Sequence, residues 1–120
     1  MTKIVFYRSD GIFYGFEEQG HTGYGEEGTD ILCSALSAMT MLLINTIEVA
    51  YDSRVDYDIE DNTTTIRVRS RAALPEYEEN DQKRYAVSGQ FLGYYRQLAD
   101  LMEEYSDYLD VKVVNRPYEG

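Results

Sequence analysis

The chain of 120 residues contains no tryptophan, two prolines, one histidine and one cysteine. A single cysteine cannot form an internal disulfide, which excludes a disulfide-held fold and favours a reducing compartment. A zinc site needs three or four ligands, and one cysteine with one histidine falls short of that number even with a carboxylate added. We therefore expect neither a metal ion nor any other cofactor.

Basic residues are also scarce. Eleven Lys and Arg against 22 Asp and Glu give a formal net charge of −11. Such a surface repels the phosphates of nucleic acids and attracts basic partners at long range, although plain solubility explains the same charge more simply. The sequence predicts no direct contact with nucleic acid.

Signals for export or membrane insertion are missing as well. The N-terminus, MTKIVFYRSDG, is too short and too charged for a signal peptide. The longest apolar stretch, ILCSALSAMTMLLINTIEVA, contains Ser, Thr, Asn and Glu and so favours a buried helix over a membrane span. We expect a cytoplasmic protein without membrane contact, folded as one domain over residues 1–120.

The remaining pattern alternates strands and helices. Residues 3–9 and 12–18 predict a β-hairpin around Asp10-Gly11. A helix follows from Thr29 or Asp30, both good N-cap residues. Because this helix is apolar on most faces, we expect it to be the central helix of the fold, with most of its faces covered by other elements. Its additional apolar surface could also form a dimer contact.

The second half repeats this alternation. Residues 53–70 predict another hairpin, turning at Asp61-Asn62. Residues 73–84 predict a loop or the frayed start of a helix, because Pro75 and an acidic cluster oppose regular structure. The stretch 85–109 has helical spacing, and the overlapping stretch 108–116 alternates as a strand. The order ββ-α-ββ-α-β predicts a two-layer α+β domain, with a mixed sheet of about five strands and two main helices.

The only histidine and the only cysteine fall in one short stretch, GHTGYGEEGTDILCSA, over residues 20–35. If Asp30 is the N-cap, Cys33 lies in the first helical turn, where unpaired N–H groups favour a thiolate. His21, folded back, could take the thiol proton, and the same N–H groups could stabilise an oxyanion. The stretch therefore allows a His–Cys catalytic pair.

Plainer explanations exist for each of these residues. A lone cysteine in an apolar helix is more often a packing residue, and a lone histidine in a glycine-rich loop more often lies in solvent. Asp30 either caps the helix or also orients His21. Ser37 either faces the same pocket as Cys33 or fills space. The residues alone leave these alternatives open.

Four glycines lie between the predicted hairpin and the helix: Gly20, Gly23, Gly25 and Gly28. Glycine costs the most entropy to order, and this loop has no large aliphatic side chain to offset the cost. We expect a mobile loop around His21.

The same stretch resembles the signature of the ribosomal-processing cysteine protease family, Prp. The signature combines Gly-His, a tyrosine-containing loop, Gly-x-Asp-Ile-hydrophobic-Cys and a serine four residues on. It matches this chain without a gap at Gly20, His21, Tyr24, Gly28, Asp30, Ile31, Cys33 and Ser37. The segment SGQFLGYYRQLADLMEEYSDYLDVKV is similar to the family's C-terminal helix and strand, so the resemblance covers nearly the whole chain.

This resemblance implies a cysteine endopeptidase. It makes Cys33 the nucleophile, His21 the general base, and Asp30 and Ser37 supporting residues, with the glycine-rich loop ordering over the substrate. The implied substrate is the precursor of the basic large-subunit ribosomal protein L27, whose N-terminal extension is removed during ribosome maturation. The resemblance also implies a homodimer.

Two other functions were weighed against the protease. A non-catalytic ribosome-assembly or interaction module of the same fold would be favoured by loss of His21 or Cys33, and the sequence keeps both. A thiol redox sensor usually needs a resolving cysteine, and the chain has none. The sequence therefore favours the protease.

Overall fold

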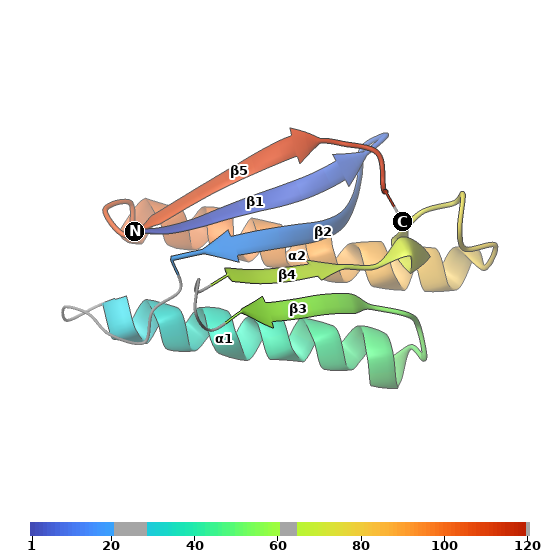
Figure 1. Cartoon of the computed structure of the whole chain (residues 1–120), viewed down its shortest axis with the longest axis horizontal. Helices are drawn as coiled ribbons and strands as arrows, with labels where there is room; N and C mark the ends of the chain where they lie inside the picture. The colour runs from blue at the N-terminus through green and yellow to red at the C-terminus, as the bar shows by residue number, and fades with distance from the viewer. Residues whose placement is uncertain (21–28, 61–64, 120) are drawn as a thin grey trace.

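The computed structural model describes residues 1–20, 29–60 and 65–119 (Figure 1). Its elements are β1 (Thr2–Ser9), β2 (Ile12–Gln19), α1 (Thr29–Asn45), the π-helical turn η1 (Thr46–Ala50), β3 (Asp56–Glu60), β4 (Thr65–Arg69), the 3-10 turn η2 (Arg71–Ala73), α2 (Asp81–Glu104) and β5 (Leu109–Asn115). The predicted α+β class and the order ββ-α-ββ-α-β are confirmed.

The five strands form one mixed sheet in the order β3-β4-β2-β1-β5. Strand β5 runs parallel to β1, and the other neighbours are antiparallel. Both helices lie on the same face of this sheet, and no helix of the described residues lies on its other face (Figure 1). This layering places a single apolar core between the sheet and the helices.

The hairpin of β1 and β2 turns at Asp10-Gly11, as predicted. Both residues have positive φ, 50° and 80°. Two consecutive residues of this kind form the turn whose twist matches that of two antiparallel strands, and Asp-Gly is a favoured pair for it. The local sequence therefore fixes how β2 returns along β1.

The core is built largely from aromatic and aliphatic side chains of β1, β2 and the two helices. The Phe6 and Phe16 rings lie 5.4 Å apart, and Phe16 also meets Phe91 of α2 at 6.1 Å. The largest fully buried apolar side chains are Phe6, Phe16, Phe91, Ile4, Leu32, Leu36, Ile47, Leu74, Leu98, Leu109 and Val68. Burial of this set is the main force that holds both helices on the sheet.

The expectation that the first helix is covered on most faces is wrong. Ile31 is 65% exposed, Leu42 is 64% exposed and Val49, in η1, is 75% exposed. Leu36 and Ile47 on the other side are fully buried. Helix α1 buries one side against the core and leaves an apolar side facing outward.

By length and composition, one helical stretch among the described residues, Ile31–Ala50, could cross a membrane. Its buried side chains, including Leu36, Leu43 and Ile47, belong to the hydrophobic core. This packing is that of a core helix lying on a sheet.

The second helix begins earlier than predicted. Asn80 caps it, because its side-chain Oδ1 accepts a hydrogen bond from the Lys83 N–H at 3.0 Å. Asp81, in the first turn, complements the positive end of the helix dipole. The prediction of a loop or frayed start over 73–84 is thus wrong over 81–84, since these polar residues form the capped first turn of a helix. The helix ends at Glu104, short of the predicted 109.

The second hairpin is confirmed by the antiparallel pairing of β3 with β4. Its predicted turn at Asp61-Asn62 lies outside the described residues. Tyr57 and Ile59 alternate along β3 as expected, yet both remain about half exposed because β3 is an edge strand.

Candidate functional site

Cys33 lies near the N-terminal end of α1. It is the fifth residue of the helix and is only 4% exposed. Leu36 and Thr40, at the next positions of the same helix face, are buried as well. The thiol therefore lies on the side of α1 that packs inward. The N-terminal end of α1 lies at the end of the molecule where β2 also ends (Figure 1).

The structure changes the expected capping of this helix. Because α1 begins at Thr29, Asp30 is its second residue and not its N-cap. Cys33 thus follows the four residues whose N–H groups lack an intrahelical partner. The free N–H groups still lie within one turn of the cysteine, so an anion at this helix end is stabilised by them.

Several predicted site residues lie outside the described part of the chain. They are His21, Gly23, Gly25 and Gly28, together with Tyr24 of the matched signature; for Asp30 only the backbone is described. The predicted pairing of His21 with Cys33 and the predicted mobile loop therefore remain predictions.

Two other predicted residues are described. Ser37, one turn after Cys33, is exposed, whereas Cys33 is buried. Gly20 has a φ of +76°, and a Cβ at this position would lie 2.6 Å from the carbonyl oxygen of Met1. Glycine is therefore required where the chain leaves β2, for both conformation and space.

A polar cluster beneath α1 was not predicted. Glu18 of β2 is fully buried, and its Oε1 accepts hydrogen bonds from the Tyr94 hydroxyl of α2 and, at 3.1 Å, from Thr40 Oγ1 of α1. The two hydroxyl oxygens are themselves 3.1 Å apart. Three elements of the fold thus meet at one carboxyl group.

Burial dominates the electrostatics of this cluster. It raises the pKa of Glu18 from 4.5 to about 7, although the hydrogen bonds from Tyr94 and Thr40 oppose the increase. Burial and the neighbouring Glu18 carboxyl also hold the pKa of Tyr94 well above its usual range, so that phenol remains a donor. The sequence contains one indication of this cluster. Glu18 follows the apolar Phe16 by two residues in the same strand, so both lie on the same face of the sheet.

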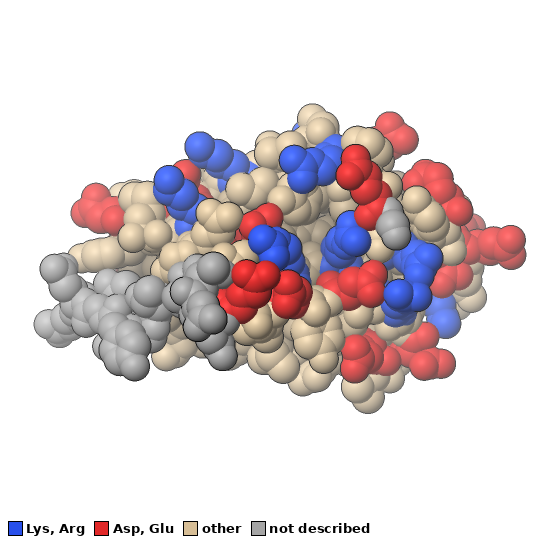
Figure 2. All heavy atoms as spheres, viewed as in Figure 1, with Lys and Arg blue, Asp and Glu red and all other residues tan. Residues whose placement is uncertain are grey.

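The open face of the sheet carries a cavity of about 380 Å³. Its lining comes from the strands, from residues flanking them and from the C-terminal segment, and none of it from α1 or α2. Acidic and basic side chains alternate around this face (Figure 2). Arg67 lies within 3.5 Å of carboxylate oxygens of Glu17, Asp58 and Glu60. Much of the charge around this cavity is therefore neutralised within the protein.

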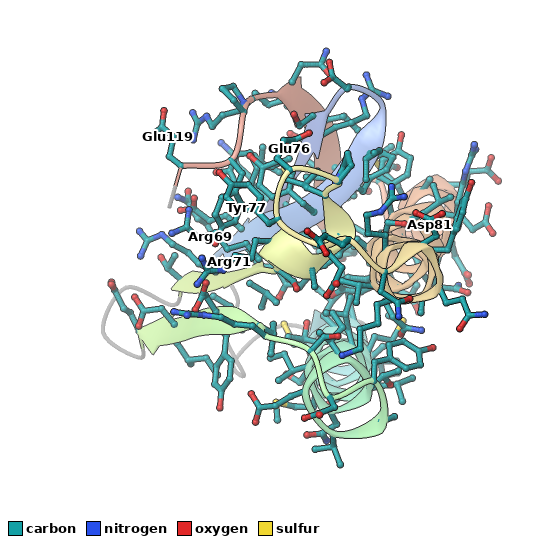
Figure 3. All side chains as sticks on the ribbon, turned by 90° about the vertical axis from the view of Figure 1, so that its right-hand side faces the viewer. Arg69, Arg71, Glu76, Tyr77, Asp81 and Glu119 are labelled. Carbon is teal, nitrogen blue, oxygen red and sulfur yellow. The ribbon has the colours of Figure 1, made fainter. Side chains whose placement is uncertain are left out.

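The C-terminal segment closes one end of that face. The Tyr118 ring lies 5.5 Å from the Tyr14 ring and beneath the Arg69 guanidinium, whose carbon is 4.8 Å from the ring centre. Arg69 also donates to the main-chain oxygen of Glu119, and both residues are labelled in Figure 3. These contacts hold the segment over the strands, apart from the helix face where Cys33 lies.

The described residues contain no group of three or more His, Cys, Asp or Glu side chains able to hold a metal ion.

Comparison with known proteins identifies a family. The family model described as cysteine protease Prp matches residues 1–110. A comparison with curated proteins gave no significant match.

Solved structures agree in fold. SMU.848 from Streptococcus mutans superimposes with a TM-score of 0.79 at 24% identity, covering 97% of this chain and 99% of that one. The essential ribosomal processing protease Prp from S. aureus, in complex with a substrate peptide, gives a TM-score of 0.73 at 20% identity, covering 97% and 100%. The same S. aureus protease with a covalently linked product peptide gives 0.69 at 23% identity, covering 95% and 100%.

Proposed function

Because this chain belongs to the Prp family of cysteine proteases, we propose that it is a cysteine endopeptidase that removes the N-terminal extension of the ribosomal protein L27 precursor during ribosome maturation. The observation that carries the proposal is the family match over residues 1–110, which includes the single cysteine of the chain. The protein would act in the cytoplasm, where ribosomes are assembled.

The proposed chemistry uses Cys33 and His21. His21 takes the thiol proton, and the thiolate attacks the carbonyl carbon of the scissile peptide bond. The tetrahedral intermediate collapses, the leaving amine takes the proton from His21, and a thioester remains on Cys33. Water then attacks the thioester with His21 again as base, which releases the new carboxylate and restores the thiol.

Two observations support a covalent route at this position. Cys33 lies within one turn of the free N–H groups of α1, which favour a thiolate and an oxyanion. The S. aureus relative has been crystallised with a covalently linked product peptide. We assign Asp30 and Ser37 supporting roles, since both lie in the same two turns of α1 as the cysteine.

The charge of the protein suits a basic substrate. A formal net charge of −11 attracts a cationic ribosomal protein at long range and raises the rate of encounter at low salt. The effect is sequence-independent, so it supports the class of substrate and not the position of the cleaved bond.

We also propose that the protein is a homodimer joined through the outward side of α1. Ile31 and Leu42 are exposed there, and a hollow of about 230 Å³ lies between α1 and α2. Met39 and Leu42 line the hollow on one side and Gly89 and Gly93 on the other. A second copy would remove this apolar surface from water.

The direct test is incubation of the purified protein with precursor L27, followed by intact mass measurement. The wild-type protein is expected to shorten the precursor at one bond, and Cys33→Ala is expected to abolish cleavage while costing about 1 kcal/mol of stability. Ser34→Ala is the matched control, because Ser34 is an exposed neighbour on the same helix. An intact precursor after incubation with the wild type would instead favour a non-catalytic assembly module.

A further inference from the structure

Glu18 is the one buried carboxyl group in the described part of the chain, and the proposed reaction does not use it. On the sheet it lies between Ile4 of β1 and Ile66 of β4, which offer no polar partner. Within residues 1–20, 29–60 and 65–119, its hydrogen bonds come from Thr40 and Tyr94, and both reach the same oxygen, Oε1.

The second carboxyl oxygen differs from the first. Oε2 of Glu18 is buried without a hydrogen bond among the described residues. Among the elements that the structure describes, the ionisable group that faces Glu18 is Tyr94 of α2; β1 and β4 present Ile4 and Ile66, and α1 presents Thr40. No described cation forms an ion pair with it. A neutral carboxyl leaves one polar atom unpaired here, whereas a carboxylate leaves a buried charge, which costs far more.

The position of the cluster connects it to the cysteine. Thr40 follows Cys33 by seven residues on the same buried side of α1, which is about 10 Å along the helix axis. Glu18 precedes His21 by three residues in the chain. The carboxyl group therefore bridges the strand that leads to His21 and the helix that carries Cys33, with Tyr94 tying both to α2.

We propose that Glu18 is a positioning residue for the cysteine site: its carboxyl group joins β2 to α1 and α2, and its ionisation places an unpaired charge in the core, which loosens the packing around this bridge and lowers activity. The inference rests on the proposed function for its link to activity. The structural part of the proposal, that ionisation loosens α1 next to Cys33, depends only on the contacts of Glu18 and not on the proposed function. Since burial moves the titration of Glu18 to about pH 7, the change falls near neutral pH.

The test compares Glu18→Gln with Glu17→Gln. Glutamine at position 18 keeps an oxygen that accepts from Tyr94 and Thr40 and cannot ionise. Glu17 is the matched control, because it is the next residue, points to the open face, and contacts Tyr7 and Arg67 there. Both substitutions replace one carboxyl group with an amide of the same shape.

The first readout is amide hydrogen exchange in α1 between Ile31 and Thr40, at pH 6 and pH 8 after correction for the intrinsic rates. In the wild type and in Glu17→Gln, protection is expected to fall by about tenfold between the two pH values, because a group titrating near 7 is about 90% ionised at pH 8. In Glu18→Gln it is expected to stay constant. Equal behaviour of all three proteins would overturn the bridge.

The second readout is kcat/KM for precursor cleavage over the same range. The ratio of Glu18→Gln to wild type is expected to be near one at pH 6 and to rise several-fold at pH 8, with no such rise for Glu17→Gln. If the kcat/KM ratio stayed constant while the amide exchange of α1 changed, Glu18 would have only a structural role, and its proposed role in positioning the cysteine site would be wrong. Absence of cleavage by every protein would refute the proposed function, while the exchange data would still decide whether the bridge loosens.

Discussion

The hydroxyl of Tyr94 in α2 donates a hydrogen bond to the carboxyl group of Glu18 in β2, across the core of the domain. Thr40 of α1 donates to the same oxygen at 3.1 Å. The pair therefore fixes the spacing of two helices and the central strand by polar contacts in surroundings that are otherwise apolar. Such a network is stable only while its members are satisfied, so its protonation state matters.

The first prediction concerns stability against pH. The unfolded chain binds a proton at Glu18 only below about 4.5, whereas the folded chain keeps it up to about pH 7. Between these values folding takes up a proton, so the free energy of unfolding falls as the pH rises through this window. The loss attributable to Glu18 is about 3 kcal/mol.

Urea unfolding at pH 4.5 and pH 8 measures this loss. Other groups titrate over the same range, so the informative quantity is the difference between Glu18→Gln and Glu17→Gln. We expect the stability of Glu18→Gln to depend less on pH by about 3 kcal/mol. Parallel curves for the two variants would show that Glu18 ionises at an ordinary pH.

The second prediction removes the Tyr94 hydroxyl. Tyr94→Phe is expected to lower the free energy of unfolding by about 1–3 kcal/mol, because it leaves Glu18 with one donor in place of two. The loss should be larger at pH 8 than at pH 5.5, since the ionised carboxyl depends more on its donors. Thermal unfolding at both pH values provides the measurement.

Tyr95→Phe is the control for that change. Tyr95 is the next residue of α2, its ring lies 5.0 Å from the Phe13 ring, and its hydroxyl makes no hydrogen bond within the described residues. We expect this substitution to be nearly neutral. Similar losses for both variants would mean that the Tyr94 hydroxyl contributes little to the cluster.

The third prediction tests the proposed dimer. Leu42→Glu is expected to convert the protein to a monomer in sedimentation velocity experiments, because it places a charge in the apolar side of α1 that a second copy would cover. Tyr57→Glu introduces the same charge at a half-exposed position on the edge strand β3 and should leave the dimer intact. A wild-type monomer, or an unchanged dimer for Leu42→Glu, would contradict the proposed interface.

Local chemistry explains why most of the fold could be predicted. The Asp10-Gly11 turn and the alternation of each strand depend on near neighbours in sequence, so the element order followed from them. The pairing of β5 beside β1 could not be predicted, because parallel neighbours are joined through distant parts of the chain. The start of α2 was missed because Asn80 and Asp81 are residues that both loops and helix caps favour.

The candidate site also contains residues that could be predicted from the sequence and residues that could not. Cys33 could be placed near the start of a helix because capping residues precede it, although the helix begins at Thr29 and not after Asp30. Glu18 was not assigned to the core, although its alternation with Phe16 places both on one face of the strand, because charged residues are rarely fully buried. The exposed side of α1 was missed for a similar reason, because apolar composition does not say what covers a helix.

The last prediction addresses the pairing of His21 with Cys33. If the two side chains form an ion pair, the imidazolium stabilises the thiolate, and His21→Ala is expected to shift the alkylation profile of Cys33 to higher pH. Iodoacetamide rates between pH 5 and pH 10 measure this shift, which belongs to the pair and not to either residue alone.

Gln19→Ala is the control, because Gln19 is an exposed residue at the end of β2 and lies two positions from His21. Because Cys33 is only 4% exposed, slow alkylation is expected for all three proteins, and the position of each profile on the pH axis is more informative than its height. Superimposable profiles for wild type and His21→Ala would show that His21 does not activate the thiol in the free enzyme, and the pair would then have to assemble only when substrate binds.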